Sequence, residues 1–158
     1  MKKILLVLSL VLTFSLVGCS STNEFKNVST SDVEKAVLES NLLVENPMSA
    51  DVMEFDYFND VQDSIEEGFV SRAAMIVALE DVIFIKAVDE ENAAKVLSTL
   101  ESYKQDMVMR PFADGYGKQE NATRAANTIV EQKGKYVYLI SADKVEDLQK
   151  VILDKIQK

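Results

Sequence analysis

Leu16-Val17-Gly18-Cys19 is the stretch of this chain whose residue types and spacing point most directly to a chemical reaction. An apolar residue, a branched residue and glycine precede a cysteine, which is the pattern of a bacterial lipobox. In that motif the cysteine thiol is acylated and the chain is cut directly before it. We therefore expect Cys19 to carry acyl chains, with Leu16, Val17 and Gly18 as the recognition sequence.

The residues before this motif have the layout of a signal peptide. Met1-Lys2-Lys3 is basic, and residues 4–17 form an uncharged, largely apolar run of 14 residues. A membrane-spanning helix needs about 20 apolar residues, so the run fits a signal-peptide core better than a span. The alternative, an incidental Cys19 in an uncleaved helix, does not explain the abrupt change to polar residues at 20–23. We expect residues 1–18 to be removed.

The number of cysteines bears on where the protein is located. Cys19 is the only cysteine among 158 residues, so no disulfide can form within the chain, and lipidation accounts for a thiol that would otherwise be left unpaired in an exported protein. One acyl chain binds a membrane only marginally, so stable anchoring takes two or more. We expect a protein lipid-anchored at the extracytoplasmic face of the cell membrane, in a Gram-positive bacterium.

The charge of the chain excludes one class of partner. Without Lys2 and Lys3 the remaining residues carry 15 basic and 26 acidic side chains, a net charge of −11. An acidic domain is repelled by nucleic acid, so no nucleic-acid partner is expected. A need for solubility would by itself account for the acidic composition.

Groups that commonly drive catalysis are missing from the sequence. It contains no histidine, which removes the commonest general base near neutral pH and the commonest zinc ligand. With Cys19 acylated there is no free thiol. Gly115-Tyr116-Gly117-Lys118 lacks the spacing of a phosphate-binding loop. We expect no catalytic residues, no metal ligands and no cofactor.

Carboxylates are the remaining reactive groups, and they cluster in residues 51–67 and at Glu80 and Asp81. Two carboxylates are enough for glycoside hydrolysis, so a small hydrolase stays an alternative. A calcium loop needs a central glycine, which residues 51–63 lack. We interpret the cluster as a solvated acidic face.

The tyrosines could form a ligand platform or belong to the core. Tyr136 and Tyr138 lie two residues apart on an expected strand and therefore share a face; Tyr103 and Tyr116 are the others considered. We favour core packing with the hydroxyls at the rim.

Local patterns predict the elements that carry these residues. Ser31 and Glu34 form a capping box for a helix that ends near residue 40, after a flexible tether over residues 19–30. Residues 48–67 are hard to interpret, with helix expected in part of them. Later elements follow clearer patterns. We expect strands at 69–77 and 81–88, then a helix at 90–109 that Asp89 starts and Pro111 closes. A short helix at 118–126, a hairpin of 128–132 and 135–141 around Gly134, and a last helix capped by Asp143 and Glu146 complete the chain.

This element order predicts one domain over residues 31–158 with an α+β fold. We expect a mostly antiparallel four-stranded sheet with helices packed on one face, a ββαββα-like arrangement preceded by an N-terminal helix.

The strand patterns also support a family resemblance. The features are Glu80 to Ala87, the long helix after it, Tyr116 in a short loop, and Gly134-Lys135-Tyr136-Val137 at the start of the last strand. With the lipobox and the acidic domain, the chain resembles the DUF4358 lipoproteins over about residues 55–156. That resemblance implies a location and a class of protein, and it supplies no catalytic or ligand residues.

These observations lead to a functional expectation. We expect a non-catalytic module at the cell envelope that binds an envelope protein or a small ligand, neither of which the sequence identifies. The alternatives are a carboxylate-dependent cell-wall hydrolase and a purely structural envelope spacer.

Overall fold

The computed structural model describes residues 25–44, 47–74, 78–109 and 118–158. In chain order the elements are α1 (Thr30–Glu39), β1 (Pro47–Asp51), the 3-10 helices η1 (Val52–Glu54) and η2 (Asp56–Ser64), β2 (Ile65–Ala73), β3 (Asp81–Ala87), α2 (Glu90–Met109), α3 (Lys118–Ala126), β4 (Ile129–Lys133), β5 (Tyr136–Ser141) and α4 (Val145–Ile156). The residues predicted to be the lipobox, Leu16, Val17, Gly18 and Cys19, lie outside the described ranges, as do Pro111 and Tyr116. Within those ranges no helix is long and apolar enough to cross a membrane.

The strands form one antiparallel sheet in the order β1-β2-β3-β5-β4. The strands β3 and β5 are buried at every position, because helices cover both faces of the sheet. This explains why β3 is a nearly continuous apolar run instead of an alternating one. Between β4 and β5 the turn contains Gly134 at a φ of 58°, a conformation that glycine adopts without steric cost.

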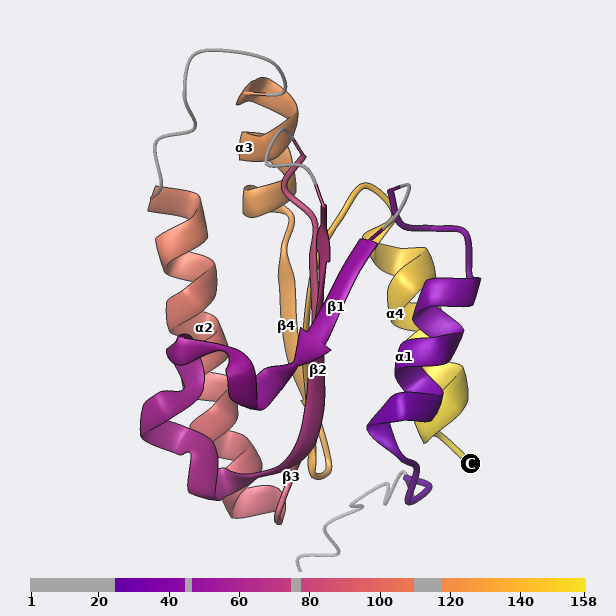
Figure 1. The fold of residues 1–158 in the computed structure, drawn as a ribbon, viewed down its shortest axis with the longest axis vertical. Coiled ribbons are helices and arrows are strands. Elements are labelled where there is room, and N and C mark those ends of the chain that lie inside the picture. Colours follow the sequence, from indigo (N-terminus) through magenta and orange to yellow (C-terminus); the bar gives the residue numbers. More distant parts are fainter. Residues whose placement is uncertain (1–24, 45–46, 75–77, 110–117) are drawn as a thin grey trace, which may run out of the picture.

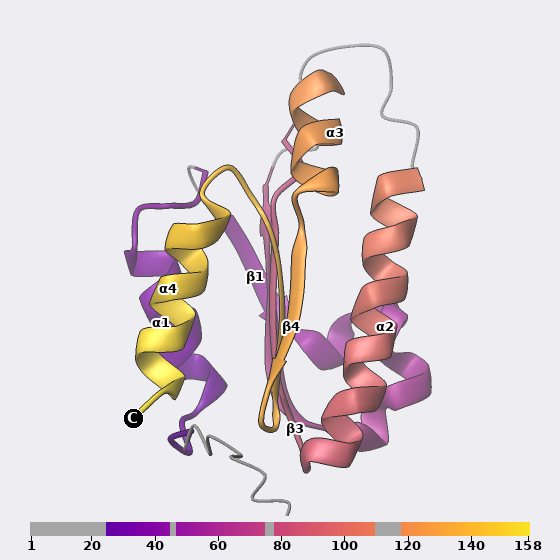
Figure 2. The ribbon, with the colours of Figure 1, turned by 180° about the vertical axis from the view of Figure 1, so that it is seen from behind.

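Helices lie on both faces of the sheet (Figures 1 and 2). On one face α1 and α4 lie side by side, and on the other α2 and η2 pack together. Alternate residues of β3 serve the two faces: Val82 and Phe84 join the core under α1 and α4, while Ile83 and Ile85 join the core under α2. Each core also takes a buried helical stripe with three- and four-residue spacing, from Ala93, Val96, Leu100, Tyr103 and Met107 in α2 and from Leu148, Ile152 and Ile156 in α4.

Two predictions about the sheet are wrong. The sheet has five strands instead of four, because residues 47–51 form the edge strand β1, which the sequence pattern did not reveal. Helices pack on both faces instead of one, since the apolar stripes of α1 and α4 cover the face opposite to α2. The α+β class, the antiparallel pairing and the preceding N-terminal helix are confirmed.

The helix starts also differ from the expected capping boxes. Ser29 caps α1 by accepting a hydrogen bond from the Ser31 amide, and the Glu34 carboxylate instead accepts a hydrogen bond from the Ser49 hydroxyl. In α4 the cap position is Lys144 and has no side-chain hydrogen bond, because Asp143 pairs with Arg124. The start of α2 is as predicted: Asp89 accepts from the Asn92 amide at 2.8 Å.

Residues 25–30, at the end of the segment expected to be a tether, contact the folded body. Phe25 bridges to Gln157, and the Lys26 amide donates to the Ile156 carbonyl at 2.7 Å. The Tyr136 hydroxyl accepts from the Val28 amide at 2.9 Å and donates to the Lys26 carbonyl at 2.8 Å. The start of the described chain is therefore held beside its C-terminus.

Candidate functional site

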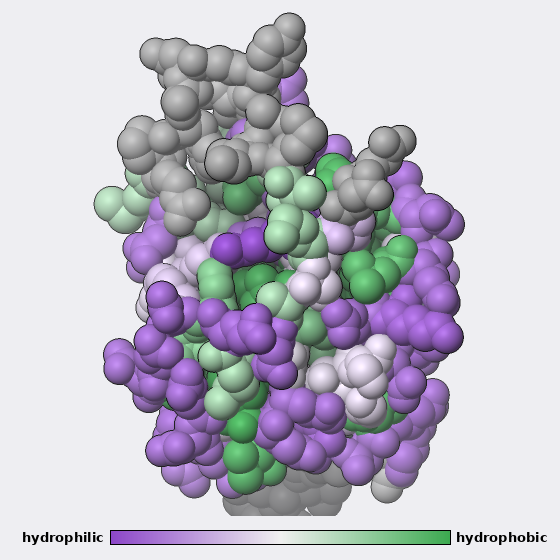
Figure 3. Space-filling model, in the orientation of Figure 1, coloured by the Kyte–Doolittle hydropathy of each residue, from purple (hydrophilic) through white to green (hydrophobic). Residues whose placement is uncertain are grey.

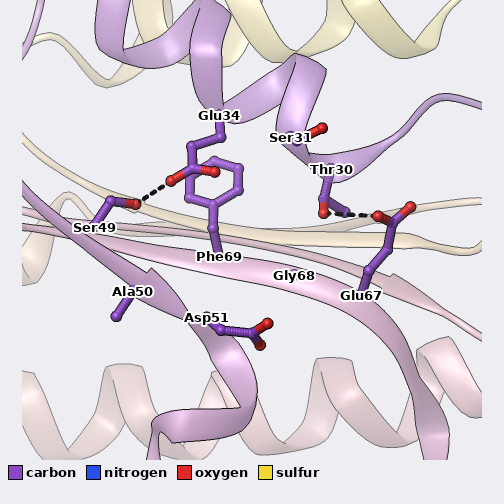
Figure 4. Close-up of a pocket in the computed structure, with 9 residues that line it drawn as sticks. All are labelled: Thr30, Ser31, Glu34, Ser49, Ala50, Asp51, Glu67, Gly68 and Phe69. Atoms are coloured by element: carbon purple, nitrogen blue, oxygen red, sulfur yellow. Dashed lines mark hydrogen bonds between the residues drawn. The ribbon is translucent and has the colours of Figure 1, made fainter.

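A polar hollow lies between α1 and the β1–β2 edge of the sheet (Figure 4). Its volume is about 340 Å³, and three carboxylates, three hydroxyls and one buried aromatic ring contribute to its wall. The lining residues are Thr30, Ser31, Glu34, Ser49, Ala50, Asp51, Glu67, Gly68 and Phe69. We refer to this site as the α1–β1 hollow.

The register of β1 against β2 brings the lining residues together. Ser49 pairs with Ser71 and Asp51 with Phe69, and Phe69 belongs to the core under α1 and α4. Directly paired residues share a face of the sheet, so Ser49 and Asp51 lie on the α1 side. From α1 the residues Thr30, Ser31 and Glu34 face this edge with helical spacing.

Glycine at position 68 allows the close packing under the hollow. A Cβ atom there would lie 2.8 Å from Val52 Cγ1 and 2.9 Å from the Phe84 carbonyl oxygen. Both distances are shorter than real Cβ contacts, and the second neighbour is backbone that cannot rotate away. Gly68 therefore lets η1 rest directly on the sheet beneath the hollow.

Hydrogen bonds tie the two walls of the hollow to each other. The Ser49 hydroxyl of β1 donates to the Glu34 carboxylate of α1 (Figure 4). At the other end the Thr30 hydroxyl donates to Glu67 Oε2 at 3.2 Å. Asp51 accepts from the Met53 amide at 2.8 Å and so begins η1. Each carboxylate of the hollow thus has a defined position before any ligand is present.

A buried lysine lies at the Glu67 end. The Lys86 ammonium lies 3.0 Å from Glu67 and 2.8 Å from Glu66, and its side chain is only 7% exposed. Burial alone would lower the pKa of Lys86, but its hydrogen bonds to Glu66 and Glu67 outweigh burial and raise the pKa. The hydrogen bond from Lys86 lowers the pKa of Glu66.

A second, smaller hollow of about 240 Å³ lies between α3 and the end of β5, and it includes Arg124 and Asp143. Arg124 Nε and Nη2 lie 2.6 and 2.9 Å from the two Asp143 oxygens, a bidentate pair. Arg124 lowers the pKa of Asp143 through this pair. The arginine of this hollow is thus already paired within the domain, and Glu120 is the other carboxylate that lines it, whereas three carboxylates line the α1–β1 hollow.

A buried hydrogen-bond network joins the N-terminal end of β3 to α2. The Tyr103 hydroxyl donates to Asp81 at 2.5 Å, and Arg72 pairs with the same carboxylate at 3.2 Å. The Arg72 guanidinium also lies over the Phe55 ring, 4.2 Å from its centroid. These contacts satisfy the buried Asp81 within the fold, so the network serves packing.

The acidic residues singled out from the sequence separate into two groups. Within residues 51–67, Glu67 is half-buried at the hollow and the other six are exposed. The exposed ones are Asp51, Glu54, Asp56, Asp60, Asp63 and Glu66. Glu80 is 5% exposed, and both of its carboxylate oxygens accept from the Val44 amide. Burial raises the pKa of Glu80. Among the described residues, no three potential metal ligands are placed so that they could hold a metal ion together.

Of the tyrosines considered from the sequence, the three inside the described ranges, Tyr103, Tyr136 and Tyr138, pack in the cores, as predicted. Tyr136 and Tyr138 are buried on the α1–α4 side, and the Tyr138 hydroxyl donates to Glu131 and accepts from Gln149. Tyr103 is buried on the α2 side.

No sequence pattern indicated the α1–β1 hollow. Glu34 was expected only as a capping partner, and Thr30, Ser49 and Glu67 were not singled out as a group. Alternation of polar residues at 49 and 51 was the available signal, but Pro47 obscured the strand.

Comparison with known proteins gives one match. A family model described as "Domain of unknown function (DUF4358)" matches residues 39–142. No curated protein and no solved structure matches the chain. The match includes the β1 and β2 side of the hollow and leaves α1 residues 30–34 outside it.

Proposed function

The chain belongs to the DUF4358 family, whose domain has no known function, and from this premise we propose that it is a lipid-anchored, non-catalytic binding module at the extracytoplasmic face of the cell membrane. The α1–β1 hollow is its binding surface in this proposal. Acyl chains on Cys19 would hold the module at the membrane, with an envelope protein or a small ligand as its partner.

The observation that carries the binding role is the composition of the hollow. Glu34, Asp51 and Glu67 gather there with the Thr30 and Ser49 hydroxyls, and internal hydrogen bonds fix their positions. Prepositioned oxygen acceptors bind a cationic or hydroxyl-rich partner without a large ordering cost. The histidine-free sequence and the single cysteine favour binding over catalysis.

A wall-directed hydrolase is the second candidate, because the hollow contains more than one carboxylate. Glu34 and Glu67 already accept hydrogen bonds from neighbours in the domain, which favours the binding role. Release of reducing sugar ends from purified cell wall by the parent chain, lost in both Glu34→Gln and Glu67→Gln, would establish the hydrolase instead.

Thermal unfolding of the full chain in detergent tests the binding role. Soluble wall fragments, small polyamines and polyols are the probes, because a ligand of the folded state raises the midpoint by mass action. We expect one probe class to raise the midpoint of the parent and of Glu101→Gln, a matched change on α2, but not of Glu34→Gln. No shift with any class would favour a structural spacer.

A further inference from the structure

The outward edge of β1 is available for pairing. The Ala73 amide of β2 donates to the Glu80 carbonyl, so the backbone groups of Ala73 point away from β1. Along an antiparallel ladder the direction alternates by residue, so Arg72 and Val70 point toward β1. Their register partners Met48 and Ala50 then complete the ladder, and Ser49 lies between them with its backbone groups directed outward.

The sequence of β1 agrees with this assignment. Pro47 pairs with Ala73, so its missing N–H falls on the outward side, where the β1–β2 ladder needs no donor. Within the described part of the chain, no backbone hydrogen bond outside the regular elements involves Ser49. The N–H and C=O groups of Ser49 and the N–H of Asp51 therefore offer a short template for a further strand, whereas the Asp51 C=O begins the turn of η1.

The two sides of this edge differ in chemistry. On the α1 side lie the carboxylates of the α1–β1 hollow, including Glu34 and Asp51. Met48 shares the opposite side with its register partner Arg72 and is 64% exposed, and Met53 of η1 is 42% exposed. Figure 3, which views the molecule from the β1 side, shows hydrophobic residues interspersed with hydrophilic ones on this face.

We propose that the β1 edge accepts an extended polypeptide segment of a partner protein, in which basic side chains alternate with apolar ones, as a sixth strand of the sheet. Side chains of a strand alternate between faces, so one set would enter the acidic hollow and the other would lie against Met48. Charge complementarity selects a basic partner over a second copy of this acidic chain, whose net charge without Lys2 and Lys3 is −11. The inference rests on the proposed binding function and names its partner class.

Three synthetic peptides test the proposal against the full chain in detergent at physiological salt. The first is a capped Lys-Val-Lys-Val-Lys-Val peptide; the second has the same side chains with alternate backbone nitrogens methylated; the third replaces Lys by Glu. We expect the first peptide to bind at least about tenfold more tightly than the other two, because strand addition needs both backbone hydrogen bonds and matching charge. Equal binding of the methylated peptide would show charge attraction without strand pairing and overturn the proposal.

Protein variants test the same interface from the other side. Glu34→Lys should weaken the first peptide about tenfold, whereas Glu101→Lys, the same charge change on exposed α2, should leave binding within about twofold. Ser49→Pro removes one outward N–H and should abolish binding; if it does not fold, the methylated peptide provides the equivalent measurement. The proposal would be overturned if Glu34→Lys and Glu101→Lys changed the peptide affinity equally. It would also be overturned if the parent chain were a dimer and Ser49→Pro made it a monomer. If a small probe stabilises the parent through Glu34 while no peptide binds, this inference fails and the proposed binding function stands.

Discussion

The Lys86 ammonium lies 3.0 Å from the carboxylate of Glu67, which lines the α1–β1 hollow. Lys86 is on central β3 and Glu67 on β2, paired in register, so the ion pair joins the core of the sheet to its candidate binding surface. Of the carboxylates in the hollow, Glu67 is thus held by an ion pair to a buried side chain of the central strand.

Replacement of Lys86 tests this support. Lys86→Met should lower the free energy of unfolding by about 2 kcal/mol, because it removes charged hydrogen bonds from a buried position. Lys150→Met, at an exposed position on α4, should change it by less than about 0.5 kcal/mol. Because the pKa of Lys86 is raised, its contribution is present at neutral pH and is lost only as the pH rises through that pKa. Urea unfolding measures the free energy of unfolding of both variants and of the parent. A Lys86→Met protein as stable as the parent would contradict the prediction.

The contribution of Glu80 to stability should also decline as the pH rises, but in the range of a carboxylate pKa instead of an ammonium pKa. Burial raises its pKa, so the folded protein binds this proton more tightly than the unfolded chain does. Stability attributable to Glu80 is therefore present at low pH and declines as the pH rises through its raised pKa. The parent should lose stability relative to Glu80→Gln between acid and neutral pH, measured by urea unfolding at each pH. A constant difference between the two proteins would refute the assignment.

Gly68 should resist even the smallest side chain. Gly68→Ala places a methyl group against Val52 and the Phe84 carbonyl, and we expect a loss of about 2 kcal/mol in the free energy of unfolding. Ser49→Ala, on the neighbouring strand, removes an exposed hydroxyl and its hydrogen bond to Glu34, and it should cost less than about 1 kcal/mol. A Gly68→Ala protein as stable as the parent would show that η1 moves aside.

Cys19→Ala tests the anchor. We expect the parent from a bacterial host to begin at Cys19 with added acyl mass and to sediment with membranes. The variant should retain residues 1–18 or leave the membrane fraction, since it lacks the thiol that is acylated. Intact-protein mass spectrometry of both proteins decides the matter: a parent beginning at Met1 without acyl mass would remove the basis for a lipid-anchored module.

The elements that the sequence predicts well are those with strong local patterns. The continuous apolar run of β3, the Asp89 cap of α2 and the glycine turn before β5 all occur as expected. The start of α4 fails because Arg124, from α3, takes Asp143 away from the helix. A tertiary ion pair outweighs the local cap in that case, and no local pattern contains it.

The candidate site was harder to predict than the fold. Its walls come from α1 and from the β1–β2 hairpin, so Glu34 and Ser49 meet only after the edge strand has paired. The sequence of β1 lacks the alternation of apolar residues that identifies a strand, and proline, which begins it, is rare in strands other than edge strands. Recognition of β1 would have shown Ser49 and Asp51 on one face.

The bridge between Phe25 and Gln157 brings both ends of the described chain to one corner of the molecule (Figure 1). A fluorescent or affinity tag fused after Lys158 would therefore emerge beside the segment that leads back to Cys19. The same proximity makes the domain suitable for circular permutation, with a short linker joining the old ends and new ones opened elsewhere.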